Sequence, residues 1–528
     1  MQPTAVKINR CEEQSMKDKK TLNIYKAASM VLMIMIMVLI IALWGRNDFS
    51  RYLIYDKGRI ADKVMLAAKF SVMLFILYKS TVDKKYFITI LSFVQAAGIF
   101  WVRFLGNKVI DSEYMKIDRL TITICIIIVL TVIFINLYTF MNDNLSFVWI
   151  LISSLGFMGV ALSFDLVWMD FFLALAFLGM YMWFEKGRYL ILGAGIVAEI
   201  FVTISSIFAA QKIEILSIQS VIVCRAMDVT GAFYPAVMMI IAACVLLMCG
   251  AWIFIKSDAD ACIKLYLTSI VMIAAGTYLF IRFIPAYSGD IIGTVLKFAG
   301  AVILLLLSVY LNVVKQWKNA VMVLSMACPA GLIALFGAGH VITVWYGIMM
   351  MLIYIPLIII LYLNEDSGRY MYVHIVSVFC LILVPVEMVS YRMSAFKLYL
   401  KVENKVWLAI MAVSYVVFVI GLIRWMNRFD KDVSDSRKQT EDSGKAGRNL
   451  LCAALIILAA VIIFMPLTIK DWIYPMMSRT EIMISDISSN KVHMEHIIVT
   501  SVMVIVTFLI PILVIKISNL RKRNLKSQ

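Results

Sequence analysis

Long apolar runs separated by short polar links are the feature that most limits what this chain can fold into. One of them, KLYLTSIVMIAAGTYLFIRF at Lys264–Phe283, contains no carboxylate. About 20 residues at about 1.5 Å per residue cross a hydrocarbon layer about 30 Å thick, so this run predicts a membrane-spanning helix. The small residues at 274–276 predict a face that a second helix can approach closely. Arg282, near the end of the run, is placed to reach lipid headgroups.

The same pattern repeats along the whole chain of 528 residues, of which 63% are hydrophobic and 16% charged. Soluble proteins are only about 45–50% apolar. A transmembrane β-barrel would show weak alternating segments of about ten residues instead of long apolar runs. We therefore predict an all-α, polytopic membrane protein with about sixteen transmembrane helices, embedded in the lipid bilayer.

Charge and polarity divide the chain into four predicted regions. Residues 1–114 hold a basic cytoplasmic head and the N-terminal transmembrane helices, and residues 115–430 form the main transmembrane core. The mixed charges, Ser and Gly of residues 431–448 predict a polar, flexible loop. Residues 449–528 contain the C-terminal transmembrane helices and end in a basic tail.

The formal net charge of +16 fits a membrane protein whose Lys and Arg residues lie mainly on the cytoplasmic side. Loops near residues 186, 256, 316 and 367 are basic, which places both termini in the cytoplasm and the protein in the cell membrane. Two N-terminal loops are basic on the opposite side, so the topology of the N-terminal third stays open. Anionic headgroups account for the charge, and no nucleic-acid partner is expected.

No cofactor, metal site or catalytic residue is predicted. The nine cysteines lie mostly inside apolar runs, and none forms a C-x-x-C pair, so they are interpreted as small buried apolar residues. His493 and His496 have helical spacing but lack a third metal ligand. The chain also lacks a Walker loop and a Rossmann glycine motif.

Several segments of the core carry a resemblance to a known family. They occur in the order Ile117–Thr121, SLGFMGVALSFDLVWMDFFLALAFLGMY, MIAAGTYLFIRFIP, VVKQWKNAVMVLSMACPAGLIALFGAG, Gly339–Thr343 and Pro385–Arg392. They resemble, in the same order, motifs of the antiporter-like membrane subunits. These subunits are shared by respiratory NADH dehydrogenase (complex I), membrane-bound hydrogenases and multi-subunit Na+/H+ antiporters.

The resemblance implies an antiporter-like core with inverted repeats, two consecutive units of about five helices each, at 115–430. Broken helices are expected around 243–262 and around Pro385. It also implies a hetero-oligomeric complex with other membrane subunits, and H+ or Na+ as the candidate ion. In such complexes electrons travel through separate subunits, so the chain would be a non-redox subunit without a catalytic centre of its own.

The departures from the family concern its buried proton relay. Positions that hold titratable side chains in the family are here Ala174, Thr268, Val344 and Ile348. Arg392 stands at a family lysine position, but an arginine does not deprotonate in proteins. The resemblance therefore implies that the helical scaffold persists while the family's proton-relay residues are largely lost.

Ionisable residues that remain inside apolar runs need an explanation, because a charge at the bilayer centre costs about 2.5–3.5 kcal/mol. Glu199 is either a structural hydrogen-bonding group or a relocated carboxylate paired with Arg188 or Lys69. Glu387 follows Pro385, and it is either an ion-path residue or a structural partner of its polar neighbours. The candidate intramembrane polar path comprises Glu199, Glu387, Arg392, His340, His374 and Arg188, with His340 alternatively a loop or interface residue.

Two hypotheses follow. The first is a divergent antiporter-like subunit of an ion-translocating or redox-linked complex of the NADH dehydrogenase, hydrogenase or Na+/H+ antiporter type. The alternative is a membrane scaffold, an assembly partner or a transporter of another solute that uses the same helices.

Overall fold

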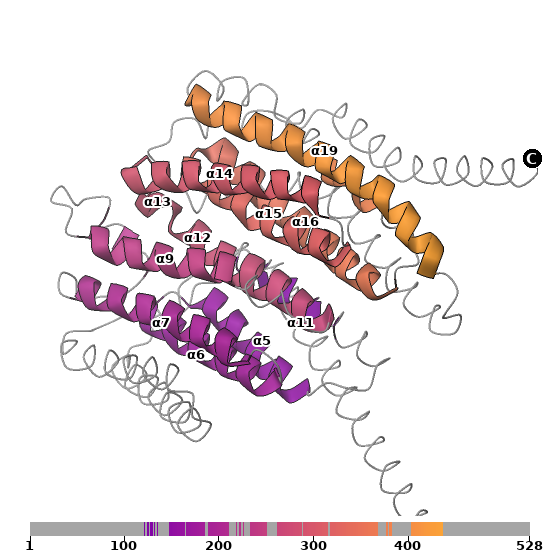
Figure 1. The fold of residues 1–528 in the computed structure, drawn as a ribbon. Helices are drawn as coiled ribbons and strands as arrows, with labels where there is room; N and C mark the ends of the chain where they lie inside the picture. Colours follow the sequence, from indigo (N-terminus) through magenta and orange to yellow (C-terminus); the bar gives the residue numbers. More distant parts are fainter. Residues whose placement is uncertain are drawn as a thin grey trace, which may run out of the picture. The chain divides into compact units, whose positions relative to one another are not determined.

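The structure is a computed structural model that describes mainly residues 147–163, 165–184, 188–210, 233–250, 261–287, 289–314, 317–367 and 403–436, with isolated positions at 121–135, 218–225 and 376–382. Its secondary-structure elements in the described part are all helices (Figure 1). The chain divides into two compact units, Met1–Thr203 and Ile204–Gln528.

The first unit is built from helices that pack backbone against backbone. It contains α5 (Phe147–Leu162), α6 (Leu166–Trp183) and most of α7 (Arg188–Ala210). A Cβ built on Gly156 would lie 2.6 Å from the backbone nitrogen of Ala176, and one on Gly179 equally close to that of Ser153. Because neither glycine has room for a side chain, α5 and α6 pack closely, backbone against backbone.

Local capping fixes where α6 begins. Asp165 is its N-cap residue, with extended backbone angles, and its carboxylate accepts a hydrogen bond of 2.8 Å from the backbone nitrogen of Val167. A side-chain oxygen at this position satisfies one of the free N–H groups of the first turn. Asp165 therefore has a structural role at the start of a helix.

The second unit begins with α9 (Tyr234–Gly250) and a helix of three parts. These are α11 (Ala261–Tyr266), the π-helix η2 (Leu267–Thr277) and α12 (Tyr278–Arg282), followed by the short α13 (Ile284–Tyr287). The span predicted at Lys264–Phe283 is thus confirmed as a helix. Its sequence did not reveal the π-helical turns, a feature that is frequent at functional sites.

The small residues of this span pack against α9. A Cβ built on Gly276 would meet Met248 at 2.8 Å from Cγ and 2.9 Å from the backbone nitrogen, so the predicted close approach is confirmed. Arg282 differs from its prediction. It is 8% exposed, and its Nε donates to the hydroxyl of Tyr278 at 2.9 Å instead of reaching outward.

Four long helices complete the described part of the second unit. They are α14 (Ile291–Val313), α15 (Trp317–Ala338), α16 (Val341–Ser367) and α19 (Lys405–Ser436), the last with 32 residues. A Cβ on Gly300 of α14 would lie 2.5 Å from the backbone nitrogen of Ala334 of α15. α19 lies along α14 (Figure 1), where Asn312 donates to the carbonyl of Val417 at 3.0 Å.

Seven helices of the described residues are long and apolar enough to cross a membrane. This confirms a polytopic helical membrane protein, but the described part does not test the predicted number of about sixteen. α9 runs without a break to Gly250, and residues 251–260 and Pro385 lie outside the described part. The predicted helix breaks, inverted repeats and region boundaries therefore stay predictions.

Candidate functional site

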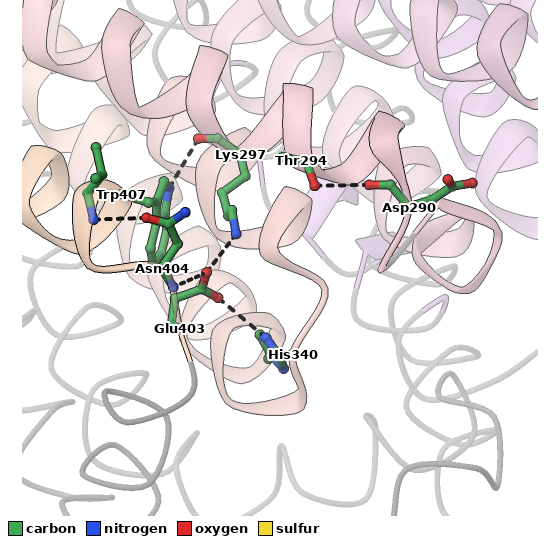
Figure 2. A network of polar contacts seen from close by, with 8 residues as sticks. Asp290, Thr294, Lys297, His340, Glu403, Asn404 and Trp407 are labelled. Carbon is green, nitrogen blue, oxygen red and sulfur yellow. Dashed lines mark hydrogen bonds and ion pairs between the residues drawn. The ribbon is translucent and has the colours of Figure 1, made fainter.

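Three ionisable side chains from different parts of the second unit meet at one end of its helices (Figure 2). Lys297 is on α14, His340 lies between α15 and α16, and Glu403 comes just before α19. Lys297 Nζ is 2.6 Å from Glu403 Oε1, and His340 Nε2 is 3.3 Å from Glu403 Oε2. We call these three residues the end cluster.

The start of α19 holds Glu403 in place. The backbone nitrogen of Asn404 donates to Glu403 Oε1 at 2.8 Å, and the Asn404 side chain accepts from the backbone nitrogen of Val406 at 2.9 Å. Within the first turn of the helix, the indole Nε1 of Trp407 donates to the carbonyl of Lys297 at 3.1 Å. The cap and the indole together fix the start of α19 against α14.

A glycine turn presents His340 to the cluster. Gly339 has a φ of 69°, a left-handed backbone conformation that suits glycine and ends α15. Thr343, in the first turn of α16, donates its hydroxyl to the carbonyl of His340 at 2.8 Å. The two helices therefore meet at a tight corner with the imidazole at its tip.

Exposure is graded across the end cluster. The side chains of His340, Lys297 and Glu403 are 41%, 13% and 3% exposed. Burial lowers the pKa of His340 below its ordinary value of 6.5; the Glu403 carboxylate opposes this shift and the Lys297 ammonium adds to it. The lowered pKa favours the neutral imidazole, whose Nε2 lies beside the Glu403 carboxylate.

A second polar cluster surrounds the N-cap of α14. Asp290 accepts from the backbone nitrogen of Ile291 at 2.8 Å, from the hydroxyl of Tyr234 and from the guanidinium of Arg225. Arg225 also stacks on the Tyr234 ring, with Cζ 3.9 Å from its centre. Burial by itself would raise the pKa of Asp290, but the hydrogen bonds from Tyr234, Ile291 and Arg225 outweigh it and lower the pKa.

Glu199, the first predicted site residue, lies in the first unit and is 1% exposed. One turn before it, Gly195 packs on the ring of Phe177, and one turn after it Thr203 donates to Asp170 at 2.8 Å. Since residues four apart share a helix face, Glu199 lies on the face of α7 that packs against α6. The two roles predicted for Glu199, a structural hydrogen-bonding group and an ion-path carboxylate, both stay predictions.

The other predicted site residues are not brought together by the described part. Arg188 is the first residue of α7, but its side chain lies outside the described residues. Glu387, Arg392 and His374 also lie outside them. His340 is at a corner between helices, as the loop interpretation predicted, and its described charged neighbours are Glu403 and Lys297.

Sequence reasoning missed Lys297 and Glu403, although each left a signal. Lys297 is an isolated cation in the apolar run VLKFAGAVILLLL, where an ionisable residue should be treated as a candidate site. Glu403 and Asn404 stand directly before the apolar run of α19, a pattern typical of a helix start. Lys297 and Glu403 are more than a hundred residues apart in the sequence, so no local pattern indicated that they pair.

The positions at which the resemblance implied lost relay residues are buried. Ala174, Thr268, Val344 and Ile348 are each at most 1% exposed. Thr268 donates its hydroxyl to the carbonyl of Lys264 one turn earlier, at 2.6 Å. Among the described residues, no group of three or more His, Cys, Asp or Glu side chains has a metal-binding arrangement.

Comparison with protein-family models gives no match, and no curated protein matches either. Solved structures do match. One is a chain of the Mrp complex from a Dietzia species, with a TM-score of 0.56 and 12% identity over 86% of this chain. This chain spans 56% of that chain's length.

Two further structures are similar over most of this chain. A chain of the membrane-bound sulfane sulfur reductase, an archaeal respiratory membrane complex, has a TM-score of 0.53 and 11% identity over 75% of both chains. A chain of respiratory complex I from Thermus thermophilus has a TM-score of 0.50 and 12% identity, over 77% of this chain and 98% of that one. At these identities the likeness shows the fold alone.

Proposed function

We propose that this chain, which has the fold of the antiporter-like membrane subunits, is a divergent non-redox subunit of an ion-translocating or redox-linked membrane complex. The observation that carries the proposal is the fold. The three similar structures all come from multi-subunit membrane complexes, namely the Mrp complex, the sulfane sulfur reductase and complex I. The candidate ion is H+ or Na+, and the candidate partners are other membrane subunits in the cell membrane.

The helix interiors support a subunit in which the family's route for protons is largely lost. Ala174, Val344 and Ile348 carry no group that gains or releases a proton, and the hydroxyl of Thr268 does not titrate near neutral pH. All four are buried among helices. A proton that reached these positions would find no side chain to bind it, which is costly in an apolar medium.

The loss of these residues also favours the second candidate function, a membrane scaffold or assembly partner, or a carrier of another solute. The two candidate functions predict different neighbouring genes. A neighbourhood of hydrogenase, dehydrogenase or small antiporter genes supports the first, whereas a glycan or transport cluster supports the second.

The subunit role is tested by purification from native membranes in a mild detergent. We expect the chain to elute in a complex with other integral membrane subunits, and to remain there when Glu199 is replaced by Gln. Elution as a single species from native membranes, with no partner after chemical crosslinking, would contradict the proposal.

Conduction is tested separately with purified protein in liposomes under an imposed potential. We expect little proton uptake by the native chain, and no further loss in Glu199→Gln or Glu387→Gln. Rapid uptake that either substitution abolishes would show that the proton route has moved to other residues instead of being lost.

A further inference from the structure

We propose that the membrane surface at which α19 leaves the lipid binds an anionic phospholipid, whose phosphate contacts Arg424 and whose acyl chain lies on α19. The site is at the end of α14 and α19 opposite the end cluster. It goes beyond the role of a membrane subunit and does not depend on it, because it requires only that α19 faces lipid.

Arg424 lies at the boundary of the hydrocarbon layer. The apolar span of α19, Lys405–Trp425, ends one residue after it, although the helix continues to Ser436. On α14, Asn312 is likewise the next-to-last residue of the span Ile291–Val313. Both residues are therefore at the depth where the headgroups of the lipids begin.

Asn312 holds the guanidinium of Arg424 and leaves most of it open. The amide nitrogen of Asn312 donates to the carbonyls of Ser308 at 2.9 Å and Val417 at 3.0 Å. Its oxygen accepts a long hydrogen bond of 3.3 Å from one terminal nitrogen of Arg424, which is exposed. Within the described part of the chain, Arg424 has no carboxylate partner. A guanidinium has five N–H donors, and phosphate oxygens accept them in pairs.

Basic residues from two distant segments come to this boundary. α15 begins after the short link 314–316, so its first turn, which carries Lys318, stays beside the end of α14. On α19, Arg428 follows Arg424 one turn later, on the same face of the helix. Because Arg424 contacts α14, the two segments meet. We call Lys318, Arg424 and Arg428 the basic rim.

The carboxylates of α19 begin beyond the headgroup layer, which is about 5–7 Å thick on each side of the membrane. At about 1.5 Å per residue, Arg428 is about 6 Å beyond Arg424 along the helix, within that layer. Asp430, Asp432 and Asp435 follow from about 9 Å onward. The basic rim is therefore cationic at the depth where lipid phosphates lie.

The face of α19 on the lipid side of Arg424 is apolar and exposed. Val413, Val416 and Ile420 precede Arg424 by eleven, eight and four residues, so they lie within about 80° of it around the helix. These three side chains are between 43% and 56% exposed. From Val413 to Arg424 the helix rises about 16 Å, which is roughly half of the hydrocarbon layer. One acyl chain below the basic rim fits this length.

Charge favours an anionic phospholipid over other occupants. The basic loop near residue 316 predicts that this end of the helices faces the cytoplasm, whose leaflet carries anionic lipids. A zwitterionic headgroup would bring its own cation toward the basic rim. A partner helix over this face would also cover Arg424, and taking an unpaired charge out of water is costly.

The test uses photoactivatable lipids and the full chain, with any subunits that it retains, purified from native membranes into phosphatidylcholine nanodiscs. Two probes carry the same reactive acyl chain, one on phosphatidylglycerol and one on phosphatidylcholine, and peptide mass spectrometry locates their adducts. We expect adducts on residues 413–423 of α19, about 10-fold more of them from the phosphatidylglycerol probe. This ratio should fall at high salt, because ions screen the exposed rim.

Variants of the basic rim separate charge from structure. Arg424→Gln removes the charge, while the glutamine amide can still donate to Asn312, and we expect the ratio of the two probes to fall about 5-fold. Arg424→Lys keeps a charge and should retain at least about half of the ratio. Lys318→Gln changes a residue more than a hundred positions away in the sequence and should lower the ratio about 3-fold.

Lys405→Gln is the matched control, since Lys405 is an exposed cation at the other end of the same span and should leave the ratio unchanged. Four results overturn the proposal. They are equal labelling by the two probes, an unchanged ratio in Arg424→Gln, an equal fall in Lys405→Gln, and adducts on another polypeptide instead of α19.

Inorganic phosphate at the concentration of the probe should not compete, because it has no acyl chain. Displacement by it would assign the basic rim to free phosphate and would also overturn the lipid site. Loss of selectivity between the probes leaves the proposed subunit role standing. Failure to find partner subunits likewise leaves this site standing.

Discussion

Helices α14 and α16 are similarly apolar but occupy very different surroundings. In an 18-residue window of the span Ile342–Tyr362 of α16, 94% of residues are buried within the protein, against 28% in such a window of Ile291–Val313 of α14. α14 places small residues such as Gly293, Gly300 and Ser308 inward. Its large side chains, such as Leu306, face outward. The comparison teaches that hydropathy places a helix in the bilayer, whereas the distribution of small residues decides which face meets protein.

The largest effect should come from filling the inner face of α14. Gly300→Leu would push a side chain into the backbone of α15, whose Ala334 nitrogen and Ala330 carbonyl cannot yield. We expect a loss of about 3 kcal/mol in the free energy of unfolding, measured by denaturant titration in detergent. Gly331→Ala is the control, since its nearest side-chain atom would be 3.9 Å away. A tolerated Gly300→Leu would show that α14 and α15 can separate.

Truncating one large side chain on each helix should sharpen the contrast. Ile348→Ala on α16 removes a side chain that is fully buried, and Leu306→Ala on α14 removes one that is 63% exposed. Since lipid is as apolar as leucine, only lost packing contributes. We expect a cost of about 2 kcal/mol for Ile348→Ala and less than about 0.5 kcal/mol for Leu306→Ala. Equal costs in the same titration would mean that another subunit or segment covers α14.

The end cluster is where α14, which is mostly exposed, carries a partly buried charge, Lys297. Lys297→Met or Glu403→Gln should each cost between about 1 and 2 kcal/mol, less than a fully buried pair because Lys297 is partly exposed. The double variant should recover part of the loss, with a coupling of about 1 kcal/mol. Additive losses in a double-mutant cycle would mean that the two side chains do not stabilise each other.

The smallest effect should be a pH dependence at the N-cap of α14. The pKa of Asp290 is lowered from its ordinary value of 3.8 in the folded protein. Its contribution to stability is therefore present above about pH 4 and is lost as the pH falls. We expect Asp290→Asn to cost less than about 1 kcal/mol at pH 7 and to flatten the acid side of the stability profile. An unchanged profile would remove Asp290 from that role.

Much of the fold could be predicted because membrane spans are encoded locally. The run Lys264–Phe283 contains enough apolar residues to predict its helix, and Gly276 predicts the close contact that α9 makes there. The π-helical turns of η2 could not be predicted in this way. They depend on how the surrounding helices pack on a sequence that would also suit an α-helix.

The candidate site was harder to predict because its parts are distant in sequence. His340 was identified, but its partner Glu403 is on another element, and Lys297 was passed over within an apolar run. Buried ion pairs depend on which helices become neighbours, and neither composition nor spacing records that. An isolated charge inside a span is the local signal to follow.

α19 is longer than a membrane is thick. Its 32 residues extend about 48 Å, whereas the hydrocarbon layer is about 30 Å, and the apolar span ends at Trp425. The helix therefore continues beyond the lipid as a polar segment whose charged residues are three Asp, one Arg and one Lys. A single cysteine introduced at Ser436 would be labelled by a membrane-impermeant reagent from one side alone. Because neighbouring spans alternate in direction, that one label would orient the second unit in its membrane.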